Sequence, residues 1–384
     1  MQKKFKQLEQ ELNSILVNRT DEIHAMILAF ISGTHCVMLG TPGTAKSYMV
    51  RKFAEAFDYS GKDGSIPYFE VALNNFTKPE DVFGAVDIQK WKSQSVLTYK
   101  SENFLPNARI AFIDELSRGE AVLNSLLTIL NERTFNVNGT PNPVPLEMAI
   151  SATNFKLNAR EAEALRDRFL QWLNPKEVDV NNQADMLKLW TSSDGNVTVR
   201  FTESEVEQMR KEFDAVQLDA SVLEVYRQLI LELRKIDGNN IVLSDRRTKA
   251  ILKLIKAEAW LNGRNTIEVQ DMSSIWTACW TDEEQISKVK SKITKMLNIQ
   301  KYRFDQMYLD VKDKFDKYND ATNKTFTEAK RMKKELEELM AKAETMNAND
   351  TEARSSKLLV LGSCNQYLKI VMNDILLLSN DTII

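Results

Sequence analysis

The chain contains the stretch Val37-Met-Leu-Gly-Thr-Pro-Gly-Thr-Ala-Lys-Ser47, in which a short apolar segment leads directly into a loop with two glycines that ends in Lys-Ser. Backbone N–H groups can approach phosphate oxygens where side chains are small, and the N-terminus of the following helix attracts an anion. Lys46 would reach the terminal phosphates of a nucleotide, and Ser47 would ligate Mg²⁺. We therefore predict a site for a nucleoside triphosphate in the loop made of Gly40, Thr41, Pro42, Gly43, Thr44, Ala45, Lys46 and Ser47. The alternative is an ordinary turn between a strand and a helix, with a lysine on the surface.

Ala45 departs from the usual pattern of such loops, G-x-x-x-x-G-K-[ST], because it stands where the second glycine is normally found. A residue with a β-carbon is disfavoured in the left-handed region of backbone conformation, which glycine adopts freely. We therefore expect the backbone of Ala45 to be helical and to form the start of the helix that follows.

The composition is that of a globular protein with a helical bias, since 43% of the 384 residues are hydrophobic and 27% are charged. A chain of this length is too long for one compact core, so two or three domains are expected. The net charge of −3, from 51 basic and 54 acidic residues, gives no general reason to expect binding to nucleic acid, although such a balance would not reveal a local basic patch.

Residue types that are rare in the chain argue against several kinds of site. The three cysteines, Cys36, Cys279 and Cys364, are far apart and odd in number, which indicates a reducing compartment rather than a set of disulfides. With only His24 and His35, a histidine-based metal site or a serine-histidine pair is not expected. The charged N-terminus lacks the apolar segment of a signal peptide, and no segment has the length and apolar character of a membrane span. These observations predict a cytoplasmic protein without a membrane span.

Strand-like segments alternate with helix-like segments in the first half of the chain. The predicted strands span residues 35–39, 68–73, 109–113 and 148–153. This alternation predicts an α/β fold, with a parallel sheet covered by helices on both faces. Because ligands bind at the carboxyl ends of such strands, we expect one edge of the sheet to hold the phosphate loop together with Asp114, Glu115 and Asn154.

Asp114 and Glu115 follow the third of these strands and suit the chemistry of a phosphate loop. A carboxylate such as Asp114 can hold Mg²⁺, usually through water, and Glu115 can polarise a water molecule for attack on the terminal phosphate. Asn154, after the fourth strand, could orient the same water. The alternatives are a pair of acids that cap the next helix and an asparagine that forms a turn.

Two short segments carry pairs of arginines. Leu165-Arg-Asp-Arg-Phe-Leu170 places two arginines beside an aromatic residue, and Ser244-Asp-Arg-Arg-Thr248 opens a helix further along the chain. Arginine stabilises the charge that spreads over a phosphoryl group during transfer, so one residue of the first pair could reach the nucleotide of a neighbouring subunit, and the second pair could contribute another arginine. The alternative is arginines that are solvated or paired with nearby acids. Ser244 or Asp245 is expected to cap its helix.

The rest of the chain is predicted to be helical. Between residues 176 and about 281 the strand signal fades, which predicts a separate helical domain. Over residues 304–346 apolar side chains recur alternately every three and four positions, as in a heptad repeat. Residues 347–352 interrupt this pattern before an apolar helix over 358–378. The simplest prediction is an antiparallel hairpin of two helices, and the alternative is that both helices pack on the preceding domain.

Several segments, in the order in which they occur along the chain, indicate a protein family more specifically than any single motif does. Besides the phosphate loop they are Phe76-Thr-Lys-Pro-Glu-Asp-Val-Phe-Gly84, Phe112-Ile-Asp-Glu-Leu116, Leu123-Asn-Ser-Leu-Leu-Thr-Ile-Leu-Asn-Glu-Arg-Thr-Phe135, Ala152-Thr-Asn154, Asp167-Arg-Phe169 and Ser244-Asp-Arg-Arg247. Together they resemble the MoxR branch of AAA+ ATPases, and within it the regulatory ATPase variant A (RavA) group. The resemblance covers about residues 20 to 280. In this family Gly-Thr-Ala-Lys-Ser is a familiar form of the phosphate loop.

The resemblance implies an Mg²⁺-dependent ATP hydrolase that assembles into a hexameric ring with its sites between subunits. It assigns Lys46 and Ser47 to the nucleotide-binding loop, Asp114 and Glu115 to the magnesium and catalytic acids, and Asn154 to the first sensor. ATP rather than GTP follows from the resemblance alone.

The resemblance also assigns the arginines. Arg168 best matches the arginine finger that acts on a neighbouring subunit, with Arg166 as the alternative. Arg246 best matches the second sensor, with Arg247 as the alternative. The segment Glu132 to Leu146 resembles the hairpin before the first sensor strand, with Asn138-Gly139 as its turn.

The implied architecture is an AAA+ core over residues 1–175, an all-α lid over 176–285 and a helical C-terminal domain over 286–384. MoxR proteins commonly act with a partner that carries a von Willebrand factor A domain and remodel or mature a protein client. The small β-rich module of RavA-like proteins has no counterpart in the C-terminal sequence, so its partner preferences are not transferred. The alternatives are a nucleotide-gated assembly protein with incidental hydrolysis and a nucleic-acid motor of the same superfamily.

Overall fold

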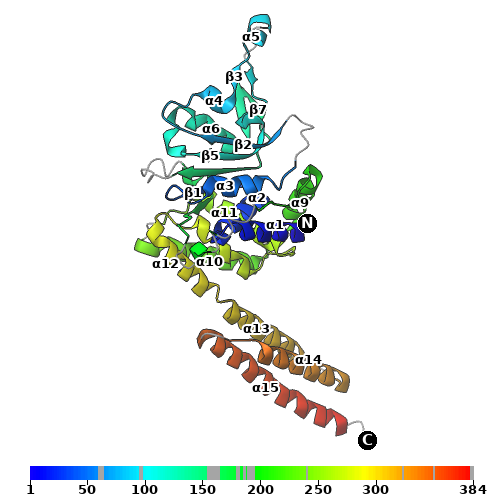
Figure 1. The fold of residues 1–384 in the computed structure, drawn as a ribbon. Helices are drawn as coiled ribbons and strands as arrows, with labels where there is room; N and C mark the ends of the chain where they lie inside the picture. Colours follow the sequence, from blue (N-terminus) through cyan, green and yellow to red (C-terminus); the bar gives the residue numbers. More distant parts are fainter. Residues whose placement is uncertain are drawn as a thin grey trace. The chain divides into compact units, whose positions relative to one another are not determined.

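The computed structural model describes residues 1–58, 65–94, 98–153, 165–178, 182–184, 187, 195–238, 241–321, 324–348 and 351–380 (Figure 1). The chain forms two compact units, Met1–Ile293 and Thr294–Ile384, which we call the large unit and the small unit. Each unit has its own core, and we describe them separately. The domain boundaries expected near residues 175 and 285 stay predictions.

The centre of the large unit is a parallel sheet, whose described strands lie in the order β2-β5-β8-β1-β9. These strands are β1 (Cys36–Leu39), β2 (Ile66–Ala72), β5 (Ala108–Asp114), β8 (Met148–Thr153) and β9 (Gln171–Leu173). The first four confirm the predicted strands and the α/β class. The fifth, β9, was not predicted, because three residues are too few to show a strand pattern. Every residue of β8 is buried, as expected for a central strand that is covered on both faces.

Helices surround this sheet and connect its strands. The helices are α1 (Gln2–Ile15), α2 (Thr20–Ser32), α3 (Lys46–Ala54), α4 (Pro79–Phe83), α5 (Ile88–Gln94) and α6 (Glu120–Glu132), with single 3-10 turns at Leu105–Asn107 and Leu116–Arg118. Helix α3 packs on β5, and α2 packs on β1 and β9. An aromatic cluster fastens α1 and α2 to the core, because the ring centroids of Phe5 and Phe201 lie 4.4 Å apart and those of Phe30 and Phe57 lie 4.2 Å apart.

Two small hairpins stand outside the sheet. Strands β6 (Thr134–Val137) and β7 (Thr140–Pro143) pair in antiparallel fashion around Asn138 and Gly139, which have φ angles of 53° and 71°. Positive φ at both central residues gives the turn type that matches the twist of a hairpin, so the hairpin predicted between Glu132 and Leu146 is confirmed.

The second hairpin was not predicted from the sequence. It pairs β3 (Ala85–Val86) with β4 (Tyr99–Lys100), and α5 lies between them in the chain (Figure 1). The strands have two residues each, which is too short for a recognisable alternation of apolar and polar side chains.

The remainder of the large unit is helical in its described part, as the sequence predicts. Its elements are α9 (Glu203–Ala215), α10 (Ala220–Arg234), α11 (Asp245–Leu261) and the part of α12 (Ile286–Met296) up to Ile293, with 3-10 segments at Ile236–Gly238, Val269–Ala278 and Glu283–Gln285. The hydroxyl of Ser244 accepts a hydrogen bond from the N–H of Arg247 at 3.1 Å, so Ser244 is the residue that caps α11. We call this helical part the lid.

The small unit corrects the prediction of a two-helix hairpin, because its described residues form three helices. They are α13 (Ile299–Asn319), α14 (Phe326–Thr345) and α15 (Thr351–Asn380). The heptad pattern continues through residues 320–325, but the local chemistry ends one helix and starts another. Thr325 and Glu328 form a reciprocal capping box that begins α14. Capping by local hydrogen bonds therefore outweighs the apolar periodicity at this point.

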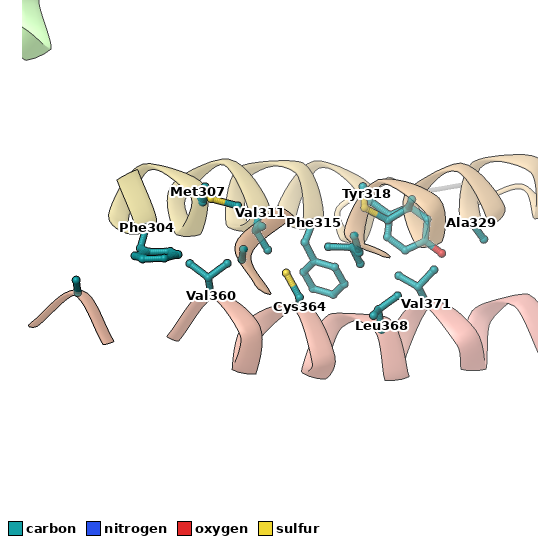
Figure 2. Close-up of a cluster of buried hydrophobic side chains, with 14 residues drawn as sticks. Phe304, Met307, Val311, Phe315, Tyr318, Ala329, Val360, Cys364, Leu368 and Val371 are labelled. Atoms are coloured by element: carbon teal, nitrogen blue, oxygen red, sulfur yellow. The ribbon is translucent and has the colours of Figure 1, made fainter. Parts of the chain in front are cut away.

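The three helices run up, down and up. Ser356 and Asp305 are hydrogen bonded at 2.6 Å near the start of α15 and of α13, whereas Tyr318 and Asp374 are hydrogen bonded at 2.9 Å near the other ends. Helices α13 and α15 are therefore parallel to each other, and α14 returns between their ends. Figure 2 shows the buried seam between α13 and α15, with side chains of α13 facing Val360, Cys364, Leu368 and Val371.

In the part of the chain that the structure describes, no helix is both long enough and apolar enough to span a membrane.

Candidate functional site

The predicted phosphate loop joins the end of β1 to the start of α3. The N–H of Gly40 donates to the carbonyl of Thr153 at 3.3 Å, which ties the loop to the end of β8. Gly40 has a φ of 151°, and a β-carbon there would lie 2.9 Å from the carbonyl oxygen of Pro175. Gly43 has a φ of 85° and open space where a β-carbon would be. Glycine is therefore required at position 40 by close packing as well as by conformation.

Ala45 overturns one expectation from the sequence. Its φ and ψ are 61° and 27°, so its backbone is left-handed rather than helical. Its carbonyl nevertheless accepts the hydrogen bond from Met49 N–H at 3.0 Å that begins α3. Ala45 thus takes the conformation of the usual glycine, at a conformational cost of about 1 kcal/mol for its β-carbon. The expectation was wrong because the turn into α3 fixes the backbone here, and the intrinsic preference of alanine is too small to change it.

Lys46 lies at the start of α3, and its side chain folds back over the loop. Its Nζ donates to the carbonyl oxygens of Gly40 and Thr41, both at 2.9 Å. Burial lowers the pKa of this amine, while the nearby carboxylates of Asp114 and Glu115 act in the opposite direction. The structure therefore brings Lys46 together with the two acids, although they are about 70 positions apart in the sequence.

Asp114 is the last residue of β5, and Glu115 follows with a left-handed backbone at φ 54°. A carboxylate oxygen of Asp114 accepts the N–H of Glu115 at 2.9 Å, which holds the strand end in a tight turn. Ser117 and Thr153 are within hydrogen-bond distance at 3.2 Å, so the end of β8 lies next to this turn. Asn154, the predicted first sensor, lies outside the described residues. We call this side of the sheet the carboxyl edge.

Arg19 is a residue of this edge that the sequence analysis missed. Arg19 is 4% exposed, and its guanidinium donates to the carbonyl oxygens of Thr44, at 3.2 Å, and Lys176, at 2.8 Å. Burial lowers its pKa. Arg19 therefore fixes the phosphate loop to the segment after β9, and it adds a second positive charge close to Lys46. A lone arginine between two helices carries no sequence signal for this role.

The segment 165–170 lies at the opposite side of the sheet. It leads into β9, whose first residue, Gln171, donates from its N–H to the carbonyl of His35 at 3.2 Å. His35 directly precedes β1, so this segment is next to the starts of the strands, which we call the amino edge. Arg168 is half-buried in this position. The four residues of β1 separate the two edges by about 13 Å.

Arg246 lies at the amino edge as well. It donates to the side-chain oxygen of Asn131 at 2.6 Å, near the end of α6. His35 accepts the N–H of Ala149 at Nδ1 and donates from Nε2 to the carbonyl of Leu130 at 3.0 Å, which places the end of α6 beside the start of β1. The structure therefore groups Arg246 with Arg168 and not with Lys46.

Arg166 and Arg247, the two alternatives from the sequence, are engaged inside the subunit. Arg166 donates to the carbonyl oxygens of Trp280 and Thr281, and its guanidinium lies 4.4 Å from the ring centroid of Trp172. Arg247 is 3% exposed and donates to backbone carbonyls on both sides of the core and lid boundary. Burial lowers the pKa of each guanidinium to about 10. Arg166 and Arg247 are therefore held within the subunit, and the roles of Arg168 and Arg246 stay predictions.

The described residues fit a nucleoside triphosphate with Mg²⁺. The loop offers open space at Gly43, the N-terminus of α3, and the amine of Lys46, which donates to two carbonyl oxygens that a phosphate can replace. Ser47 and Asp114 are the residues with oxygen atoms suited to Mg²⁺ at this edge. Among the described residues, this site included, no group of three or more His, Cys, Asp or Glu side chains is close enough to hold a metal ion.

Comparisons with known proteins show what this chain is similar to. Residues 3–212 match a family model described as the MoxR domain in MoxR-vWA-beta-propeller ternary systems, and residues 221–293 match an AAA lid domain. An uncharacterized protein of Methanocaldococcus jannaschii, MJ0079, is 30% identical over 297 residues, which cover 77% of this chain and 75% of that protein. The chaperone MoxR1 of Mycobacterium tuberculosis is 24% identical over 169 residues, or 43% of this chain and 42% of MoxR1.

A solved structure shows the same fold. The crystal structure of a candidate ATPase from Cytophaga hutchinsonii superimposes with a TM-score of 0.60 at 17% identity, and the match covers 77% of this chain and 94% of that one. At this identity the likeness concerns the fold alone. The narrower resemblance to the RavA group stays a prediction.

Proposed function

The chain belongs to the MoxR family of AAA+ ATPases, and on that premise we propose that it hydrolyses ATP at sites formed between neighbouring copies of itself. One observation carries the proposal. Lys46, Asp114 and Glu115 lie at the carboxyl edge of the sheet, whereas Arg168 and Arg246 lie at the amino edge. No single subunit in this conformation can direct both sets at one nucleotide, but two adjacent subunits can.

In the proposed reaction, Lys46 exchanges its bonds to the carbonyls of Gly40 and Thr41 for bonds to phosphate oxygens. Glu115 orients a water molecule in line with the terminal phosphate, and Asn154 is the proposed partner for the same water. Mg²⁺, held by Ser47 and Asp114, would neutralise charge on the phosphates when it is bound. The neighbouring subunit supplies Arg168 and Arg246, which stabilise the charge that develops during transfer.

A contact between different edges of two identical subunits repeats head to tail, and it closes into a ring if the rotation allows. We therefore propose a ring, and a hexamer by analogy with the family. The family model that matches this chain is named for systems with a von Willebrand factor A domain protein, so we propose such a protein as partner. We propose that it remodels a protein client, and the similarity to a chaperone supports this proposal. The three cysteines are buried free thiols, which suits the proposed location in the cytoplasm.

The first test separates binding from hydrolysis. Lys46→Ala removes the amine that faces the phosphates and should abolish ATP binding, measured by calorimetry. Glu115→Gln keeps the shape but not the charge, so it should bind ATP as the wild type does while its turnover falls by about 100-fold or more. Normal turnover in Glu115→Gln would contradict its catalytic role.

The second test asks whether the site is shared. Subunits with Lys46→Ala cannot bind ATP but still carry Arg168, and subunits with Arg168→Ala bind ATP but lack that arginine. Each variant alone should be inactive, since an arginine of this kind contributes about 10³-fold or more to turnover. A mixture of the two should recover activity, because a Lys46→Ala subunit can complete the site of its neighbour. If the mixture stays as inactive as its components, the site is not formed in this way.

A further inference from the structure

We infer that Arg166 and Arg247 form a two-way clamp between core and lid that positions Arg168, so that the lid of one subunit determines how well Arg168 reaches the nucleotide of the next. The inference rests on the proposed shared site. It gives the two arginines that the sequence left as alternatives a role of their own, as positioning residues rather than as contacts to the nucleotide.

The first half of the clamp reaches from the lid into the core. Arg247, in α11, donates to the carbonyl oxygens of Arg166, of Phe169 at 3.5 Å and of Leu170 at 2.7 Å. Its Nε donates to Ala278 in the lid at 2.8 Å. One planar guanidinium therefore binds both sides of the boundary, and its fixed fork geometry defines the distance between them.

The second half reaches in the opposite direction. Arg166, in the core segment, donates to the carbonyl oxygens of Trp280, at 2.9 Å, and Thr281, at 2.5 Å, in the lid. Its guanidinium also lies over the ring of Trp172 in β9. A third contact lies beside them, because the hydroxyl of Ser244 donates to the carboxylate of Asp167 at 3.0 Å.

These contacts involve the residues on both sides of Arg168 in the sequence. The residues before it, Arg166 and Asp167, and the residues after it, Phe169 and Leu170, are all bound to the lid, and most of the bonds are to backbone carbonyls. Bonds to the backbone fix the position of the chain itself, so the starting point of the Arg168 side chain is set by the lid. A buried guanidinium that lost these acceptors would be costly, which makes the clamp resistant to partial opening.

The lid and residues 165–170 are therefore mechanically linked. A movement of the lid carries residues 165–170 with it, and a displacement of about 1 Å at a catalytic group can cost about 100-fold in rate. The state of the lid in one subunit would therefore control hydrolysis in the neighbouring subunit, while its own phosphate loop, at the opposite edge of the sheet, would be affected little.

The experiment uses the mixture of Lys46→Ala donors and Arg168→Ala acceptors. Arg247→Lys keeps the charge but loses the fork. Placed in the donor, where Arg168 is used, it should reduce the recovered turnover by about 100-fold. Placed in the acceptor, where Arg168 is already absent, it should leave the turnover within about twofold of the unmodified mixture, with an unchanged KM for ATP. A general loss of lid structure would lower the turnover in both placements, so equal losses would overturn the inference.

Two further variants distinguish loss of the clamp from misfolding of the chain. Arg166→Lys removes the other half of the clamp and should show the same asymmetry between donor and acceptor, so the inference stays open to contradiction if Arg247→Lys does not fold. Tyr226→Phe is the matched control. It removes a hydrogen bond of 2.6 Å from the Tyr226 hydroxyl to the carbonyl of Thr248 within the lid, without touching the clamp, and it should show no asymmetry. Failure of the unmodified mixture to recover activity would contradict the shared site instead. The shared site and the clamp can therefore be contradicted by different outcomes.

Discussion

At position 45 an alanine occupies a backbone conformation that glycine normally provides, at a modest conformational cost for its methyl group. We predict that Ala45→Gly keeps ATP binding within about twofold, since glycine adopts the same conformation freely. Ala45→Val should weaken ATP binding by about tenfold or more, because a β-branched residue is a marked outlier in the left-handed region. Titration of both variants with ATP would decide. Equal affinities would show that the turn is not left-handed.

The residues of the carboxyl edge could be predicted because each of them belongs to a short, contiguous sequence pattern. Lys46 follows its loop directly, and Asp114 and Glu115 follow an apolar strand. The roles of the arginines were harder to predict. Arg246 and Arg247 are adjacent, and only the direction of each side chain makes one exposed and the other buried. Arg19 could not be predicted at all, because its role depends on backbone carbonyls that are distant in sequence.

At the scale of elements, an ionic bridge joins three helices of the large unit. The ring of His24 in α2 is hydrogen bonded through Nδ1 to Glu9 of α1 and through Nε2 to Glu258 of α11, both at 2.8 Å. Burial disfavours the protonated ring, but the two carboxylates prevail and raise the pKa of His24 to about 10. The charged form is therefore the one that fastens the N-terminal helices to the lid.

This bridge predicts how stability depends on pH. A raised pKa in the folded state stabilises the protein fully below the unfolded value of about 6.5, and the contribution is lost as pH rises towards 10. His24→Gln should therefore lower the free energy of unfolding by about 2 kcal/mol at pH 6, and the difference from wild type should shrink at pH 9.5. Urea unfolding at both pH values measures it. Lys3→Gln, which removes an exposed charge from α1, is the control and should give a difference that does not change with pH.

The errors in predicting elements have physical causes that lie beyond sequence periodicity. Strand β9 has three residues, and its place in the sheet is set by pairing with β1 rather than by a pattern of its own. The break between α13 and α14 was missed because the heptad pattern continues across it, whereas the capping box at Thr325 and Glu328 depends on a few local hydrogen bonds. The hairpin at Asn138 and Gly139 was predicted correctly because two residues were enough to specify its turn.

At the scale of the whole molecule, the chain contains two separate cores, and this separation can be tested. The small unit has its own buried seam, in which the rings of Phe315 and Tyr367 stack at 3.8 Å between centroids. Asn298 begins α13 as its N-cap and accepts the N–H of Lys301 at 3.1 Å. A cut between Leu297 and Asn298 would therefore leave α12 and the cap of α13 intact.

We predict that the chain ending at Leu297 binds ATP with an affinity within about twofold of the full chain, because the described contacts of its phosphate loop lie within the large unit. Residues 298–384 should form a helical fragment with a cooperative thermal transition, measured by circular dichroism, since three helices with a shared apolar seam bury a core of their own. A full-length chain with Phe315→Asp is the matched control. A charge in this seam should unfold the small unit and leave ATP binding unchanged. Loss of ATP binding in both the shortened chain and the control would show that the small unit supports the fold of the large one.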